Sequence, residues 1–158
     1  MRRVAVVAAS VVAAASLGLS PVTMAGEEDL VVRKVVNDLE VALYMEKPKD
    51  MVMADGMAMS GGHSTHHLEV KVFDAKSKAC VPYLAITATV TSPEGKAFTV
   101  EVPAMIGDAF HYGTNVSLPA KGTYTIALSL RPPKLMRYAK SKDRWAKPAS
   151  LTAKFAYR

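Results

Sequence analysis

The sequence predicts an all-β protein, and three observations support this fold class. Apolar and polar residues alternate in several short runs, which is the period of a half-buried strand. Turn-forming residues separate these runs, as in the Ser-Pro-Glu-Gly segment at 92–95. No stretch has the period of a long amphipathic helix. About six or seven short strands joined by turns indicate an antiparallel β-sandwich of the immunoglobulin-like kind.

The expected strands can be placed in order along the chain. Leu39, Val41 and Leu43 alternate with polar or small residues, so the pattern favours strand over residues 30–45. The connection 104–122 is expected to be mostly irregular, with at most a short strand at 115–118. The basic segment 134–148 follows a Pro-Pro pair and is expected to be a long loop. The remaining strands are expected at residues 67–73, 83–91, 98–102, 124–130 and 151–157.

The N-terminus has the marks of a secretory signal peptide. Arg2 and Arg3 precede an apolar run at 4–19, and small residues lead to Ala25 just before an acidic turn. An uncleaved membrane anchor is the second interpretation, but the apolar run is short and interrupted by serine and glycine. Residues 1–25 are therefore predicted to be removed, leaving residues 26–158 as a single exported domain.

The charge and the single cysteine exclude some classes of function. The formal net charge is +6, and the densest basic part is 134–147. An exported protein rarely meets nucleic acid, so this part is interpreted as a solvated face or a docking patch for an acidic partner. Cys80 is the only cysteine and is most simply a small buried hydrophobe. A metal ligand or an intermolecular bridge is the alternative for Cys80.

A segment rich in methionine and histidine, residues 51–66, is predicted to be a metal-binding loop. Together with the next three residues it holds three of the four histidines and four of the nine methionines of the chain. Thioether favours Cu(I). The alternative is a flap that packs against the sandwich edge or a dimer partner, with solvated histidines. The auxiliary ligands would be Met51, Met53, Met57, Met59, His63 and His66.

The principal candidate site joins a strand to a later connection. His67 and Glu69 are two apart on an expected strand, so their side chains share one face. Met105, Asp108 and His111 lie in the connection 104–122 that could close over this face. Imidazole, thioether and carboxylate together suit copper, and imidazole with carboxylate also suits ferrous iron. Each residue alone has a simpler interpretation, as an exposed strand residue, core filler or turn residue.

Catalysis is not expected. Ser117 and Ser129 have no nearby base in a known motif, and no glycine-rich phosphate loop is present in the sequence. We therefore expect a binding protein and not an enzyme.

An ordered set of short motifs resembles the periplasmic iron-transport accessory proteins. The set includes His67-Leu-Glu69, Met105 with Asp108, and His111-Tyr-Gly113 with Asn115, and it continues to the Pro-Pro pair at 132–133. The resemblance spans about residues 39–158. It implies a homodimeric immunoglobulin-like protein of the periplasm that works with an inner-membrane iron permease or associated periplasmic proteins. It also implies a site near the dimer interface that binds copper, with iron or manganese as a surrogate.

The ligands carried over by the resemblance are His67, Glu69, Met105 and His111, with Asp108 as a further ligand or a contact of one. The family pattern has another histidine after the Pro-Pro pair, but this chain has none there. Tyr138 stands in its place, and Met136 is a nearby alternative. His63 or His66 is a hypothetical substitute. The competing function is a copper carrier or resistance protein that uses the 51–66 loop, and a pure contact module is the third option.

Overall fold

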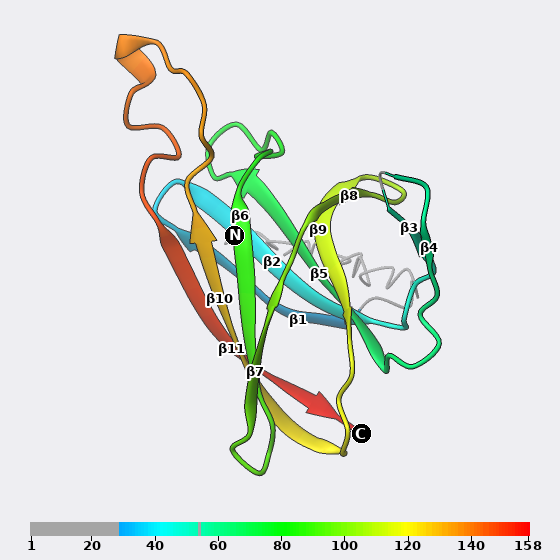
Figure 1. The fold of residues 1–158 in the computed structure, drawn as a ribbon. Helices are drawn as coiled ribbons and strands as arrows, with labels where there is room; N and C mark the ends of the chain where they lie inside the picture. Colours follow the sequence, from blue (N-terminus) through cyan, green and yellow to red (C-terminus); the bar gives the residue numbers. More distant parts are fainter. Residues whose placement is uncertain (1–28, 54) are drawn as a thin grey trace, which may run out of the picture.

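Two antiparallel sheets pack face to face in the computed structural model (Figure 1). The structure describes residues 29–53 and 55–158, so the predicted signal peptide lies outside the described residues. The five-stranded sheet has the order β1-β2-β5-β9-β8, and the four-stranded sheet has the order β11-β10-β6-β7. The predicted all-β, immunoglobulin-like sandwich is confirmed. Among the residues described, no helix is long and apolar enough to cross a membrane.

The strands of the larger sheet are β1 (Asp29–Val36), β2 (Leu39–Glu46), β5 (His66–Asp74), β8 (Ala104–Ile106) and β9 (Phe110–Val116). Those of the smaller sheet are β6 (Ala85–Thr91), β7 (Ala97–Glu101), β10 (Gly122–Arg131) and β11 (Ala149–Tyr157). A separate hairpin pairs β3 (Met51–Val52) with β4 (Ala58–Met59), and a single 3-10 turn, η1 (Ala139–Ser141), interrupts the basic loop.

The core lies between the two sheets and follows the period-two alternation of the strands. Leu68, Val70 and Val72 of β5 face it, and so do alternate residues of β10. Tyr112 is fully buried there, and its hydroxyl donates to the carbonyl of Val81 at 2.7 Å. Burial raises the pKa of this phenol. One face of every long strand is thus committed to packing, which leaves the other face for function.

Four local expectations were wrong. The run 30–45 is two strands, because Asn37 adopts a left-handed φ of 56° and reverses the chain between β1 and β2. The connection 104–122 is largely a β8–β9 hairpin, and the 51–66 segment contains the β3–β4 hairpin. Cys80 is exposed and not buried. Its backbone forms an isolated antiparallel bridge with Phe73.

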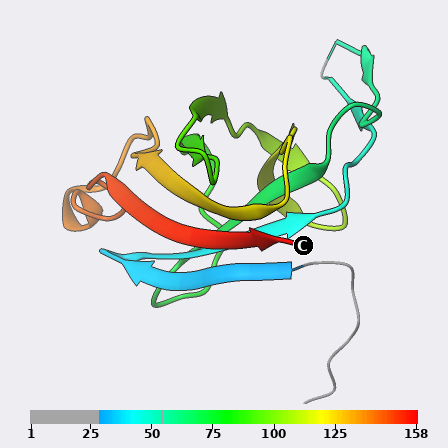
Figure 2. The same cartoon turned by 90° about the horizontal axis from the view of Figure 1, so that it is seen from below.

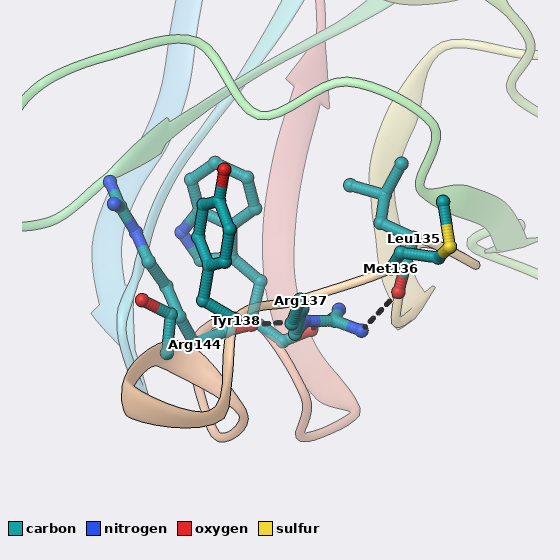
Figure 3. Close-up of a pocket in the computed structure, with 7 residues that line it drawn as sticks. Leu135, Met136, Arg137, Tyr138 and Arg144 are labelled. Atoms are coloured by element: carbon teal, nitrogen blue, oxygen red, sulfur yellow. Dashed lines mark hydrogen bonds between the residues drawn. The ribbon is translucent and has the colours of Figure 1, made fainter.

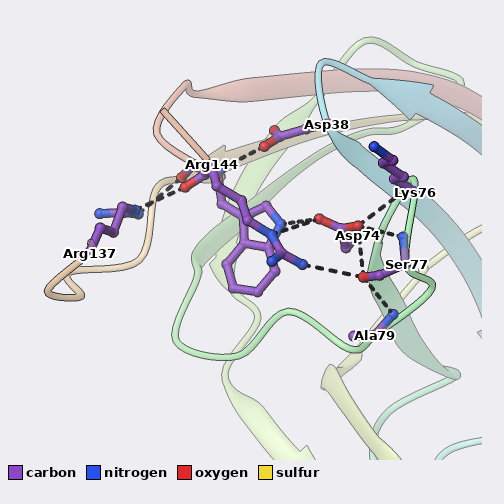
Figure 4. A network of polar contacts seen from close by, with 8 residues as sticks. Asp38, Asp74, Lys76, Ser77, Ala79, Arg137 and Arg144 are labelled. Atoms are coloured by element: carbon purple, nitrogen blue, oxygen red, sulfur yellow. Dashed lines mark hydrogen bonds and ion pairs between the residues drawn. The ribbon is translucent and has the colours of Figure 1, made fainter. Parts of the chain in front are cut away.

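The basic segment 132–148 is a long loop held at one end of the sandwich by the buried Asp74 and the partly buried Asp38 (Figure 4). Asp74 accepts hydrogen bonds from Arg144 Nε at 3.1 Å and from Trp145 Nε1 at 2.8 Å. The backbone N–H of Trp145 donates to Asp38 at 2.6 Å. This loop lies at the end of the sandwich opposite to β8 and to the β3–β4 hairpin in both views (Figures 1 and 2).

Candidate metal centre

The outer face of the five-stranded sheet carries buried polar residues. Alternation along β5 turns Leu68 and Val70 into the core and places His67 and Glu69 on the opposite face. These two side chains are only 1% and 5% exposed. His111 of β9 is also buried, at 8%. A sheet face with this much buried polarity needs partners for its polar atoms, because unpaired burial is costly.

Strand register brings the candidate residues together. Glu69 lies opposite Gly113 of β9, and His111 is two residues before Gly113 and therefore on the same face. On the next strand Met105 of β8 lies directly opposite His111. The two segments that the sequence could not join are thus neighbours in one sheet.

The ligand atoms of His67, Glu69 and His111 all lie within 4.8 Å of one another. His111 Nε2 is 3.5 Å from Glu69 Oε2. Ligand atoms held at about 2.1 Å around a tetrahedral metal lie about 3.4 Å apart. The apo geometry is therefore already close to the spacing that a bound ion needs.

A missing side chain opens the space in front of His67. A Cβ atom on Gly113 would lie 2.5 Å from His67 Nε2 and 2.8 Å from Met105 Sδ. Such distances are far inside van der Waals contact, so glycine is required for both side chains to keep these positions. The Met105 sulfur and the His67 nitrogen consequently border the same small space.

Hydrogen bonds determine which nitrogen of His67 is available. The Asn115 amide donates to the Lys49 carbonyl at 2.7 Å and accepts from the Lys49 N–H at 3.2 Å, which settles its orientation. Its Oδ1 also lies 2.9 Å from His67 Nδ1. Because that oxygen can only accept, Nδ1 carries the proton and Nε2 presents a lone pair toward the space above Gly113.

The same reasoning applies to His111. Its Nδ1 lies 2.9 Å from the carbonyl oxygen of Ala109, so Nδ1 must be the donor. In the neutral ring Nε2 is then an acceptor that faces the carboxylate oxygen of Glu69. Two acceptors at that distance repel unless a proton or a metal ion lies between them.

Glu69 offers one oxygen to the site. Its Oε1 is 2.7 Å from Lys71 Nζ, which in turn lies 4.6 Å from the centre of the Tyr44 ring. Oε2 is left to face His111. The arrangement provides two imidazole nitrogens, one carboxylate oxygen and a bordering thioether, a mixed set suited to copper and, less closely, to ferrous iron.

Several predicted site residues lie elsewhere. Asp108 is exposed in the β8–β9 turn, outside the group of ligand atoms that approach one another. His63 is exposed as well. His66 lies on the other face of β5 and packs edge-on against Phe155 and Tyr157, at 5.2 and 4.7 Å between ring centres. Burial lowers the pKa of His66; the hypothesis that it joins the metal loop is therefore not supported by its position.

Tyr138 and Met136, expected where the family has a histidine, project from the basic loop (Figure 3). Tyr138 is 80% exposed and Met136 is fully exposed. Between them Arg137 is fixed by bonds to backbone carbonyls, including Leu135 at 3.1 Å and Arg144 at 2.9 Å. This loop lies at the end of the sandwich opposite to β8. The loop is therefore remote from the candidate metal centre of the same chain.

Sequence reasoning missed the residues that position the ligands. Asn115 and Gly113 belong to a quoted motif, but their contacts with His67 depend on strand register. Glu46, directly opposite His67 on β2, is 4% exposed; its Oε2 is 2.9 Å from Lys49 Nζ, and its Oε1 has no hydrogen-bond partner among the described residues. The alternation that places Leu43 and Met45 in the core could have indicated that Glu46 lies on the opposite face of β2, the face that carries His67 on the neighbouring strand.

Comparison with known proteins agrees with this picture. The sequence model of a family described as Fe2+ transport protein matches residues 24–158, which confirms the resemblance stated from the motifs. UPF0423 proteins of Brucella abortus and Brucella suis are 28% identical over 160 residues, covering 90% of this chain and 87% of theirs.

Solved structures share the fold. A copper-bound variant of FetP from uropathogenic Escherichia coli strain F11 aligns with a TM-score of 0.74 and 24% identity, covering 84% of this chain and 98% of that one. The copper-reconstituted P19 protein from Campylobacter jejuni aligns with a TM-score of 0.72 and 21% identity, covering 84% and 97%. At these identities the likeness concerns the sandwich itself.

Proposed function

The chain belongs to the Fe2+ transport protein family, and on this premise we propose that it is a periplasmic metal-binding protein that assists high-affinity iron uptake by an inner-membrane permease. The main support is the buried group formed by His67, Glu69 and His111, whose ligand atoms all lie within 4.8 Å of one another. Two imidazole nitrogens and a carboxylate oxygen that converge in this way can bind one metal ion.

Copper is the proposed metal, with iron or manganese as the second choice. Two imidazoles and a carboxylate bind Cu(II) well, and a thioether at the border favours copper over the harder ions. The solved FetP and P19 structures that share the fold contain copper. Ligands would be His67 Nε2, Glu69 Oε2 and His111 Nε2, with Met105 Sδ as the fourth.

A homodimer is part of the proposal and carries a specific expectation. The loop with Met136 and Tyr138 is remote from the candidate metal centre in the same chain. If either side chain takes the place of the family's histidine, it must therefore come from the second protomer.

Export is proposed as well, and N-terminal sequencing of the mature protein should then give Gly26 as the first residue.

The test of the centre is native mass spectrometry of the purified protein with Cu(II), Fe(II) and Mn(II). We expect one copper per protomer in a dimer, and loss of that copper in a His67→Ala/Met105→Ala double variant. A control is His63→Ala, which removes an exposed histidine that is not in the group of ligand atoms that approach one another. Equal copper binding by the first double variant would contradict the proposed ligands.

The test of the cellular role is growth of a deletion strain. Slow growth under iron starvation, restored by the wild-type gene but not by the His67→Ala/Met105→Ala form, is expected. A strain that is sensitive to copper but grows normally without iron would instead favour the copper carrier or resistance protein.

A further inference from the structure

The β3–β4 hairpin carries methionines that the buried centre does not use. Met51 lies opposite Met59 in the register, and Val52 lies opposite Ala58. The pairing continues toward the tip, where Met53 N–H donates to the Met57 carbonyl at 2.8 Å. Gly56, with a φ of 86°, supplies the left-handed residue that this tight reversal needs.

This register places several thioethers on one side of the hairpin. Met51 and Met53 are two residues apart on an extended strand, and Met57 lies across from Met53. Residues with these relations share a face and have Cβ atoms about 4.5–5.5 Å apart across the strands. Flexible thioether side chains at that separation can converge on one ion.

The hairpin is not part of the core. It belongs to neither large sheet, and it stands off the sandwich beside β8 (Figures 1 and 2). Met53 is 48% exposed, Met57 is 64% exposed, and Val52 on the other face is 73% exposed. Burial in the fold of this chain therefore does not explain Met53 and Met57.

The ligand chemistry of the hairpin is soft. Asp55 is the only charged residue between Met51 and Met59, and its Oδ1 accepts from the N–H of Met57 at 3.0 Å. Thioether ligands select Cu(I) and bind Fe(II) or Mn(II) poorly. This set contrasts with the buried centre, where nitrogen and oxygen ligands predominate.

The base of the hairpin is tied to the buried centre. Asn115 bonds to both backbone groups of Lys49 and to the ring of His67. Gly61 closes the other side of the base, since its N–H donates to Asp50 at 3.0 Å and a Cβ there would lie 3.0 Å from Pro48. The exposed methionine face is consequently held at the same end of the sheet as His67.

We propose that this hairpin is a second metal site that binds Cu(I) through Met51, Met53 and Met57, separate from the buried centre. It goes beyond the proposed function, because it assigns a different metal state to a different, solvent-accessible site. The binding needs no redox step, since the ion arrives and remains as Cu(I).

The experiment uses Ag(I), a redox-inert analogue of Cu(I), with methionine-methyl NMR of the purified protein. All samples carry Cys80→Ser, because the exposed thiol would compete for soft ions. The hairpin methyl signals, assigned by single Met→Leu variants, should shift on addition of the first equivalent of Ag(I), and the signal of Met45, which is buried in the core, should not. Hairpin signals that do not move would overturn the proposal.

A Met53→Leu/Met57→Leu double variant tests affinity. Both side chains are exposed, so the variant should fold, as circular dichroism can check. Competition with bicinchoninate under a reductant should show Cu(I) affinity lower by at least about tenfold, equivalent to about 1.4 kcal/mol. The matched control is Val52→Ala, an exposed residue on the other face of the same hairpin; equal affinity in the double variant and this control would refute the site.

The two proposals fail in different ways. The His67→Ala/Met105→Ala variant should lose Cu(II) and keep the Ag(I) shifts of the hairpin. The Met53→Leu/Met57→Leu variant should keep Cu(II). Hairpin shifts that disappear in the first variant would show that no separate Cu(I) site exists.

Discussion

Two acids of the same strand, Glu69 and Asp74 of β5, are equally buried but differ in the number of hydrogen-bond donors around their carboxylates. Each is 5% exposed. Asp74 accepts from five donors, namely the Lys76 and Ser77 N–H groups, the Ser77 hydroxyl, Arg144 Nε and Trp145 Nε1. Glu69 has Lys71 at one oxygen and Nε2 of His111, which is an acceptor when the ring is neutral, at the other.

The difference separates a structural acid from a binding acid. A saturated carboxylate stabilises its surroundings and has no capacity left for a ligand. A carboxylate that faces a lone pair destabilises the apo protein locally and is stabilised when a cation arrives. Burial alone would have ranked the two acids as equivalent; counting the donors around each oxygen distinguishes them.

The largest expected effect comes from Glu69→Gln. The amide keeps the volume and can donate to His111 Nε2, so the apo protein should be as stable as the wild type or slightly more stable. Cu(II) affinity should fall by about a hundredfold, or about 2.7 kcal/mol, because a charged ligand is replaced by a neutral one. Isothermal titration with Cu(II) and urea unfolding of the apo form measure the two quantities. A large loss of apo stability would place Glu69 with the structural acids.

Gly113→Ala should impair the centre without removing a ligand. The new Cβ would overlap His67 Nε2 and Met105 Sδ, and overpacking of this kind costs about 1–3 kcal/mol. We expect Cu(II) affinity to fall by a corresponding factor, measured by titration. Thr114→Ala, the next residue of β9 on the other face, is the control and should bind Cu(II) normally. Normal binding by the Gly113 variant would mean that His67 and Met105 have room to move aside.

Asp74→Asn should do the reverse of the Glu69 variant. It weakens the anchor of the basic loop and should lower the free energy of unfolding by about 1–3 kcal/mol at neutral pH, with unchanged Cu(II) affinity. The donors, led by the Ser77 N–H, hold the pKa of Asp74 well below its ordinary value of about 3.9. A depressed folded-state pKa contributes stability above about pH 4, which is lost as the pH falls toward the folded pKa.

Urea unfolding at several pH values checks this assignment. The stability difference between wild type and Asp74→Asn should be full at neutral pH and should shrink as the pH falls below about 4. A difference that does not change with pH would show that the charge of Asp74 contributes nothing.

Asn115→Ala should have the smallest effect. Without Oδ1 the His67 ring loses the acceptor that keeps the proton on Nδ1, and loss of such a partner typically lowers metal affinity about tenfold. Ser117→Ala removes a hydrogen bond to the His63 carbonyl from the segment just after the same strand and is the control. Equal Cu(II) affinities in the two variants would show that the ring is oriented by packing alone.

The sequence predicted the sandwich because period-two alternation is strong in the long strands. It missed the turn at Asn37, because neither glycine nor proline marks it and the weaker turn signal of the Asn37-Asp38 pair, where Asn37 adopts a left-handed φ, was not used. It also missed β8, which is only three residues long, and most of β9, whose mixed aromatic and polar residues lack clear alternation. Short edge strands form because a neighbour supplies the hydrogen bonds, and their own residues need not favour strand.

For the candidate site, the sequence could predict only relations between residues of a single strand. The shared face of His67 and Glu69 follows from their spacing of two. Their proximity to His111 depends on the β5–β9 register, and the tautomer of His67 depends on Asn115 and on the backbone of Lys49. These are long-range relations that no local pattern contains. The fate of His66, one residue from His67 and on the opposite face, follows from the same spacing rule.

The short edge strand β8 bears on how fast metal exchanges. Met105 sits on three residues that pair with β9 on one side only, while His67, Glu69 and His111 lie on the longer β5 and β9. Edge elements with few pairings open at low free energy without global unfolding. Separation of β8 would withdraw the sulfur and leave the other three ligands in place, so we expect release to a recipient to be limited by this local opening. Such a centre can have a high equilibrium affinity for its ion and still release it fast enough for transfer to a recipient.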